Sequence, residues 1–257
     1  MTILAFHNTG RSFSPGLNNY SPGRLERLLT GLIDAGYEFV SLTDCFKSSE
    51  NNRRISITFD DGYDSFYEFA WPILFQKKIP AMVFVPFGYI GRKAGWDYAG
   101  GIWLTRHLSR EQIRKLSEAG VGIGSHGFSH IDLSRLSDRM LKLELERSKK
   151  GLEDLTGKDV KYISYPFGRF NKNVEGTAAE NGYERGFSLS SFRKSRFGFT
   201  IPRFAVYSTD TLYSVKKKTD GGFCNYLEKI KGAIMNEYSY GTIFLNKFRS
   251  AGKPEYY

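Results

Sequence analysis

Two carboxylates stand side by side in the chain, Asp60 and Asp61, directly before Gly62. Residues 54–59 alternate β-branched or aromatic side chains with small polar ones, which is typical of a strand. Neighbouring side chains on a strand point to opposite faces, so we expect the two carboxylates to have different tasks. A pair of buried carboxylates is costly unless a metal or another cation lies beside it. Taken alone, the same residues also fit an ordinary turn, because Asp-Gly is a hairpin signal.

A second stretch brings histidines to the end of another predicted strand, at 121–125. His126 and His130 follow it, four positions apart. On a helical turn, positions i and i+4 face the same way, so both imidazoles can reach one ion. Two histidines and one carboxylate also leave positions open on a metal for water and substrate. A lone pair of this kind can instead be two loop residues without a role. However, only four histidines occur in the chain, and the coincidence with Asp61 favours a metal site.

The residues around these side chains resemble the motifs of the polysaccharide deacetylases, carbohydrate esterase family 4. TFDDG at 58–62 is similar to the family's first motif, SHGFSH at 125–130 to its second, and YPFGR at 165–169 to its third. The order and separation of the motifs also match, and the resemblance covers most of residues 1–206. Each motif is weak alone, but the combination is specific.

The resemblance implies a fold, a metal and a reaction. The fold is α/β, an irregular (β/α) barrel of about seven or eight parallel strands with the site at their carboxyl ends. Asp61, His126 and His130 would hold a divalent metal, most often zinc, with cobalt or nickel as alternatives. Asp60 would be the general base, and the backbone N–H of Phe167 would bind the oxyanion. The reaction implied is hydrolysis of an N-acetyl group from an amino sugar.

The proton donor is a first departure from the common family pattern. No histidine follows His130, so the family's usual late catalytic histidine is missing. Some members begin instead with a strand and a histidine that serves as general acid, and residues 2–6 followed by His7 are similar to that start. We therefore expect His7 to be the acid, with His107 as the reserve. Without the resemblance, His7 would be interpreted as a histidine that caps an edge strand.

The third motif contains a second departure. Its common form has an arginine a few residues before the Pro-Tyr-Gly, which orients the base, but residues 161–163 contain none. Arg203, near the end of an extended segment at 201–204, is the candidate to replace it. The alternative for Arg203 is an ordinary surface arginine.

The predicted elements would bring these motifs to one edge of a sheet. Strands are expected at 2–6, 37–42, 54–59, 81–85, 121–125, 160–165 and 183–189. Helices are expected at 22–35, 65–78, 109–119, 137–155 and 173–181, with a charged turn at 216–222 and a last helix at 223–236. Such alternation predicts right-handed crossovers and a parallel sheet or barrel. We expect one catalytic domain over 1–257, in which 207–257 is a C-terminal extension packed on the barrel.

An irregular insertion is predicted for residues 86–105, and long loops in compact domains are usually functional. It contains Tyr89, Trp96, Tyr98 and Trp103, whose flat rings can cover a sugar. The alternative is that the same rings seal the mouth of the barrel.

Composition narrows the class of protein. With 40% hydrophobic and 16% aromatic residues, the chain is expected to be folded over most of its length. A net charge of +10 is compatible with binding to nucleic acid, to an acidic glycan or to an anionic membrane surface, or with a merely solvated basic surface. No motif in the sequence supports nucleic-acid binding. Cys45 and Cys224 are too few for a disulfide framework and are expected to be small apolar fillers.

The sequence also predicts a location. No stretch approaches the roughly 20 apolar residues of a membrane span. Residues 2–6 are too short for the apolar region of a signal peptide, so we expect a cytoplasmic protein, for which peripheral membrane contact remains open.

Together these features predict a metal-dependent hydrolase that removes N-acetyl groups from an amino sugar. The substrate would be an N-acetylated sugar or glycan, with nucleotide-linked and lipid-linked forms among the candidates, during assembly of an envelope polysaccharide such as O-antigen. Besides a nucleic-acid binder, which only the net charge suggests, two alternatives stay open. One is a non-catalytic glycan-binding protein of the same fold. The other is an oxygenase, which also uses two histidines and one carboxylate but requires iron and an oxo-acid cosubstrate.

Overall fold

One parallel sheet organises the chain. The structure is a computed structural model that describes residues 2–10, 18–47, 53–94, 105–189, 195 and 198–220. The strands pair in the order β8-β7-β6-β5-β4-β3-β1-β9, and β2 pairs with β3 outside this path. All of these pairings are parallel, so the carboxyl ends of the strands lie at one rim. The strands are β1 (Thr2–Phe6), β2 (Glu38–Phe39), β3 (Arg54–Phe59), β4 (Ala81–Val85), β5 (Gly122–Ser125), β6 (Tyr162–Ser164), β7 (Arg185–Ser188), β8 (Thr200–Pro202) and β9 (Phe204–Ala205).

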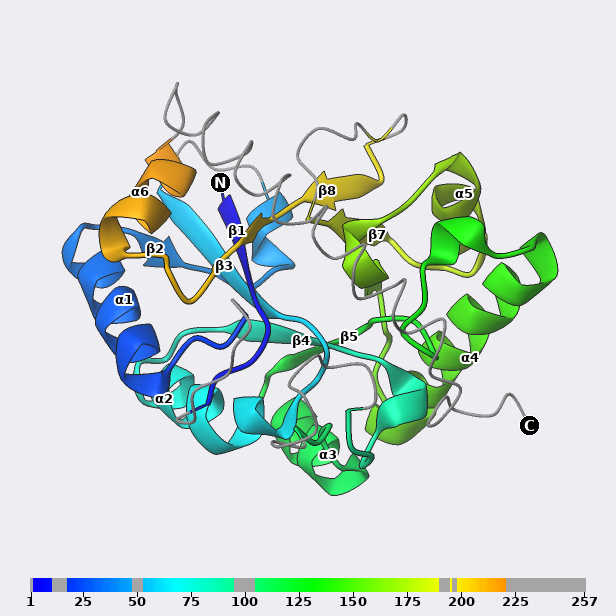
Figure 1. Ribbon diagram of the computed structural model, residues 1–257, viewed down its shortest axis with the longest axis horizontal. Coiled ribbons are helices and arrows are strands. Elements are labelled where there is room, and N and C mark those ends of the chain that lie inside the picture. Colours follow the sequence, from blue (N-terminus) through cyan, green and yellow to red (C-terminus); the bar gives the residue numbers. More distant parts are fainter. Residues whose placement is uncertain are drawn as a thin grey trace.

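Helices surround this sheet (Figure 1). In the outer layer α1 lies beside α6, α3 beside α4, and α4 beside α5. None of the helices that the structure describes is both long and apolar enough to span a membrane. The helices are α1 (Pro22–Asp34), α2 (Trp71–Gln76), α3 (Arg110–Glu118), α4 (Asp138–Thr156), α5 (Lys172–Glu180) and α6 (Leu212–Asp220).

The two edges of the sheet meet at Arg203. β8 pairs with β7, β9 pairs with β1, and Arg203 is the single residue between β8 and β9. The Arg203 N–H donates to the carbonyl of Ser188 on β7 at 2.9 Å, whereas the Val206 N–H donates to the carbonyl of Ala5 on β1 at 2.8 Å. The chain therefore passes directly from one edge of the sheet to the other and leaves a nearly closed barrel. This architecture confirms the predicted irregular (β/α) barrel.

Side chains alternate along β3 between two environments. Three apolar side chains are completely buried in the layer shared with the helices: Ile55, Ile57 and Phe59. Thr58 is also buried, but its hydroxyl donates to the Leu4 carbonyl at 2.9 Å and accepts from the Arg203 guanidinium at 3.0 Å. Because side chains repeat every two residues on a strand, Asp60 continues the Thr58 row toward the barrel interior.

Two predicted elements differ in length. The strand expected at 37–42 is only Glu38–Phe39. The helix expected at 65–78 is divided into a π-helical turn, Phe66–Ala70, and α2. Pro72 lies in the first turn of α2, and it lacks the N–H that a continuous helix would need there.

The charged turn predicted at 216–222 is wrong over its first part, because α6 continues to Asp220. Lys218 is 3% exposed and donates to the Ala205 carbonyl at 2.8 Å and to the Asp210 carboxylate at 2.5 Å. These partners stabilise a helix that a run of lysines does not indicate. Several predictions lie outside the described residues: the helix at 223–236 and the positions of Trp96, Tyr98, Trp103 and Cys224. Cys45 is buried, as expected of an apolar filler.

Close packing behind the third motif yields a stability prediction for Gly186→Ala. A Cβ at Gly186 on β7 would lie 2.0 Å from the hydroxyl oxygen of Tyr165, whose ring is fully buried. The ring has no room to move, so we expect a loss of about 1–3 kcal/mol in the free energy of unfolding, measured with urea. The control is Gly176→Ala on α5, where an added Cβ has nothing within 4 Å, and it should be neutral or stabilise by up to about 1 kcal/mol. Equal stability of the two variants would contradict this account of the packing.

Candidate active site

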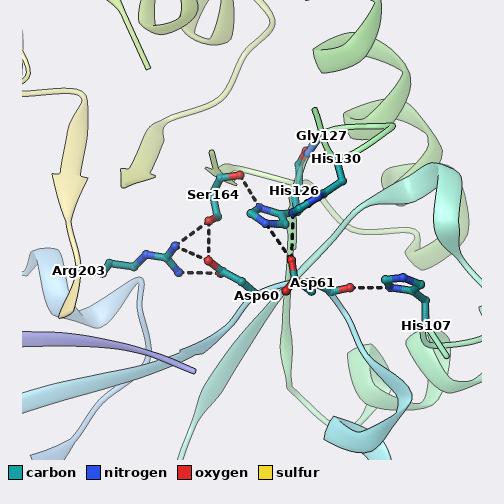
Figure 2. A network of polar contacts seen from close by, with 9 residues as sticks. Asp60, Asp61, His107, His126, Gly127, His130, Ser164 and Arg203 are labelled. Carbon is teal, nitrogen blue, oxygen red and sulfur yellow. Dashed lines mark hydrogen bonds and ion pairs between the residues drawn. The ribbon is translucent and has the colours of Figure 1, made fainter. Parts of the chain in front are cut away.

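Asp61, His126 and His130 converge at the carboxyl ends of β3 and β5 (Figure 2). The Asp61 Oδ1 lies 3.3 Å from the His126 Nε2 and 3.1 Å from the His130 Nε2. One ligand atom from each residue lies within 4.8 Å of the other two, and all three residues are buried. The structure thus brings together the three residues that the sequence analysis proposed as metal ligands.

The orientation of His126 fits a metal ligand. Its Nδ1 lies 2.7 Å from the carbonyl oxygen of Ser164 on β6. A carbonyl only accepts, so Nδ1 carries a proton and Nε2 faces Asp61, where it donates when protonated and can bind a metal when it is not. Two imidazole nitrogens and one carboxylate oxygen at these distances form a suitable donor set for a divalent cation with open positions.

Electrostatics at this cluster favour positive charge. Burial alone would raise the pKa of Asp61, but hydrogen bonds from His126 and His130 outweigh it and hold the pKa well below its usual range. Burial alone would lower the pKa of His126, but its hydrogen bond to Asp61 and the charges of Asp60 and Asp61 raise it. The buried carboxylates therefore attract a cation, which a proton or a divalent metal can supply.

Backbone strain is concentrated at the same place. In the described part of the chain, four non-glycine residues have positive φ, and three of them belong to the predicted site: Asp61 (67°), His130 (49°) and Phe167 (59°). Such conformations cost about 1–3 kcal/mol each and persist only where their surroundings hold them. The expectation that His126 and His130 share a helical turn is wrong. Gly127, with φ of 75°, and His130 have left-handed backbone conformations, and residues 126–130 form a loop instead of a helical turn.

Glu144 on α4 holds this loop, a role that the sequence analysis missed. It is fully buried, and its Oε2 accepts from the N–H groups of Phe128 at 2.8 Å and Ser129 at 3.0 Å, while its Oε1 accepts from the Ser129 hydroxyl. In the sequence, Glu144 reads as one of many charges on the solvated side of α4. Its position three residues after Leu141, on the buried side of the helix, is the signal that could have identified it.

Asp60 lies beside the cluster and forms a two-pronged ion pair with Arg203. The two guanidinium nitrogens donate to its carboxylate oxygens at 2.8 and 2.6 Å. The Ser164 hydroxyl donates to Asp60 at 3.0 Å and accepts from Arg203 at 2.6 Å. Burial alone would raise the pKa of Asp60, but the charge and hydrogen bonds of Arg203 lower it. Arg203 is therefore no surface residue, since its side chain is completely buried.

The remaining predicted residues lie around this centre. His7 follows β1 directly after Phe6, whose carbonyl accepts from the Asp60 N–H at 2.9 Å. Phe167 lies in the short 3₁₀ turn Pro166–Gly168, with its ring centroid 4.9 Å from that of His130. The reserve acid His107 is buried, which lowers its pKa to about 4, so it carries no extra proton to donate at neutral pH.

A model of the polysaccharide deacetylase family matches residues 47–186. Over 204 residues the chain is 30% identical to YxkH of Bacillus subtilis (strain 168), which is named provisionally as a polysaccharide deacetylase; 76% of this chain and 67% of YxkH are covered. It is 26% identical over 227 residues to the poly-β-1,6-N-acetyl-D-glucosamine N-deacetylase of Staphylococcus aureus (strain MRSA252). This alignment covers 82% of this chain and 76% of that protein.

Solved structures show the same fold. IcaB from Ammonifex degensii superposes with a TM-score of 0.73 at 23% identity, over 86% of this chain and 97% of that chain. The Streptococcus pyogenes deacetylase PplD, solved in complex with acetate, superposes with a TM-score of 0.73 at 22% identity, over 86% of this chain and 98% of that chain. The family match spans more than half of the 257 residues and includes all three motifs. The chain therefore belongs to the polysaccharide deacetylase family, as its motifs predicted.

Proposed function

We propose that this chain is a metal-dependent N-deacetylase that acts on N-acetylglucosamine units. The observation that carries the proposal is the convergence of Asp61, His126 and His130 beside the Asp60–Arg203 pair. A donor set for a divalent cation and a buried, ionised base thus lie side by side. Zinc is the first metal to test, because it accepts two imidazoles and a carboxylate while leaving positions open.

The substrate and the setting are also part of the proposal. The name of the Staphylococcus aureus relative makes β-1,6-linked N-acetylglucosamine the first polymer to test. A nucleotide-linked or lipid-linked precursor is the second candidate. Either would be used in the assembly of an envelope polysaccharide, O-antigen included, and we place the protein in the cytoplasm.

The mechanism assigns one task to each residue. Asp61, His126 and His130 would hold the metal, which when bound supplies a Lewis acid for the acetamide carbonyl. Asp60 takes a proton from the attacking water, and Arg203 keeps Asp60 ionised and oriented. The N–H of Phe167 donates to the oxygen on which negative charge develops. His7 protonates the amine as the C–N bond breaks, so that water and the amide yield acetate and a free amino sugar.

Metal removal tests the proposal directly. We expect a chelator to abolish acetate release from β-1,6-linked N-acetylglucosamine oligomers, and zinc, cobalt or nickel to restore it. Oligomers with β-1,4 linkages and a nucleotide-linked N-acetylglucosamine serve as comparison substrates. Oligomer binding without acetate release would support the non-catalytic alternative. Turnover that requires iron and an oxo-acid would support the oxygenase.

Asp60→Asn and His7→Gln should separate the base from the acid. Asp60→Asn should lower turnover at least about 100-fold on both an N-acetyl amide and an aryl acetate ester, because both need an activated water. His7→Gln should lower turnover about 100-fold or more on the amide only, because a phenolate leaves without a proton. The affinity for zinc should stay within a few-fold in both variants. Full amide turnover by His7→Gln would remove His7 from the acid role.

Arg203→Lys tests whether Arg203 orients the base. A lysine keeps the charge but cannot bind both oxygens of Asp60 at once, so we expect turnover to fall about 10–100-fold while zinc affinity is unchanged. The matched control is Arg185→Lys on the exposed amino end of β7, away from the site rim, and it should leave turnover unchanged. Wild-type turnover in Arg203→Lys would show that a single positive charge is sufficient.

A further inference from the structure

We infer that His107 is a positioning residue, which holds the backbone of Asp61 so that its carboxylate faces His126 and His130. This inference rests on the proposed metal site and extends it to a residue outside the three motifs. In Figure 2, His107 approaches Asp61 from a different element than the two histidines do, and it contacts the main chain rather than the carboxylate.

The contact belongs to a continuous set of hydrogen bonds between two segments. The His107 Nδ1 lies 2.8 Å from the Asp61 carbonyl oxygen. On either side of it, the Leu108 N–H donates to the Gly62 carbonyl at 2.8 Å, and the Asp64 N–H donates to the Arg106 carbonyl at 2.9 Å. The segment 106–108 thus lies along the turn that follows β3, and the imidazole binds the one carbonyl in that turn that belongs to a proposed metal ligand.

Asp61 needs such support because of its backbone. Its φ is 67°, and Gly62 follows with φ of 57°, so two successive residues are left-handed. For a residue with a Cβ this conformation is strained. A donor on the carbonyl fixes the peptide plane after Asp61 and therefore the direction of its side chain. Without it, the turn could relax and move the carboxylate away from the two Nε2 atoms.

The imidazole itself is held firmly. His107 is 2% exposed, and its ring lies 5.2 Å from the ring of Tyr63 and 5.4 Å from that of Tyr89, at interplanar angles of 27° and 48°. A buried side chain packed against two tyrosine rings has little rotational freedom. Since the Asp61 carbonyl only accepts, the proton must be on Nδ1 of His107.

Nitrogen NMR on the wild-type protein gives the first test. With ¹⁵N-labelled histidine at neutral pH, we expect His107 to be the neutral tautomer protonated at Nδ1, with and without zinc. A tautomer protonated only at Nε2 would overturn the inference, because Nδ1 would then have nothing to donate. This measurement needs no variant and does not depend on turnover.

Two variants at position 107 give the second test. His107→Phe keeps a ring against the two tyrosines but has no donor, whereas His107→Asn keeps a donor N–H near Nδ1 but no ring. We expect zinc affinity, measured by chelator competition, to fall about 10–100-fold in His107→Phe and to stay within a few-fold in His107→Asn. The absorption spectrum of the cobalt form should change in His107→Phe and match the wild type in His107→Asn.

The opposite results are distinguishable. Wild-type zinc affinity in His107→Phe, or an equal loss in both variants, would overturn the role of the donor and leave the proposed function intact. If the wild-type protein binds no divalent metal, the proposed metal site fails and this inference fails with it.

Discussion

The buried ion pair between Asp60 and Arg203 is the interaction on which the proposed site depends, and it lies at the point where the barrel closes. It joins the end of β3 to the residue at which the chain passes from β8 to β9. Two such charges lose several kcal/mol each on leaving water, and the loss is offset only by good geometry and further hydrogen bonds. The hydroxyls of Thr58 and Ser164 supply those bonds. An apolar pair could stabilise the fold equally well, so the value of this pair lies in holding an ionised carboxylate in one orientation.

The strained residues next to this ion pair are also held in place by hydrogen bonds from distant parts of the chain. Asp61 and His130 have backbone conformations that a relaxed chain avoids, and each is held by a group outside the first and second motifs. His107 binds the Asp61 carbonyl, and Glu144 binds the N–H groups that lead to His130. Alternate packing of either loop would displace a proposed ligand. The geometry of the proposed metal site therefore depends on these supporting residues as well as on the ligands themselves.

Local sequence patterns predicted the part of this architecture that local physics determines. The strand at 54–59 and a parallel sheet or barrel followed from alternation, whereas the irregular barrel and the full ligand set around Asp61 were implied by the resemblance of the motifs. The errors concern residues whose surroundings come from distant parts of the chain. Lys218 looked like part of a solvated turn but is buried against Asp210, and Glu144 looked like part of a charged helix face. For Arg203 the sequence left two alternatives open, because only closure of the barrel decides whether an arginine there is buried.

Strand pairing also accounts for the positions of the two residues that we propose as replacements for parts of the common family pattern. The family match spans 47–186 and excludes both His7 and Arg203, the two residues that we propose in place of the family's missing acid and arginine. They come from opposite ends of the described chain, but β9 pairs with β1 in the register Leu4 to Phe204 and Ala5 to Ala205. The N–H of Asp60 in turn donates to the Phe6 carbonyl at 2.9 Å, next to His7. The pairing of β1 with β3 thus places His7 next to the base, and the pairing of β9 with β1 brings Arg203 to the same place. A change that separates β9 from β1 would therefore displace Arg203 and leave His7 at the end of β1.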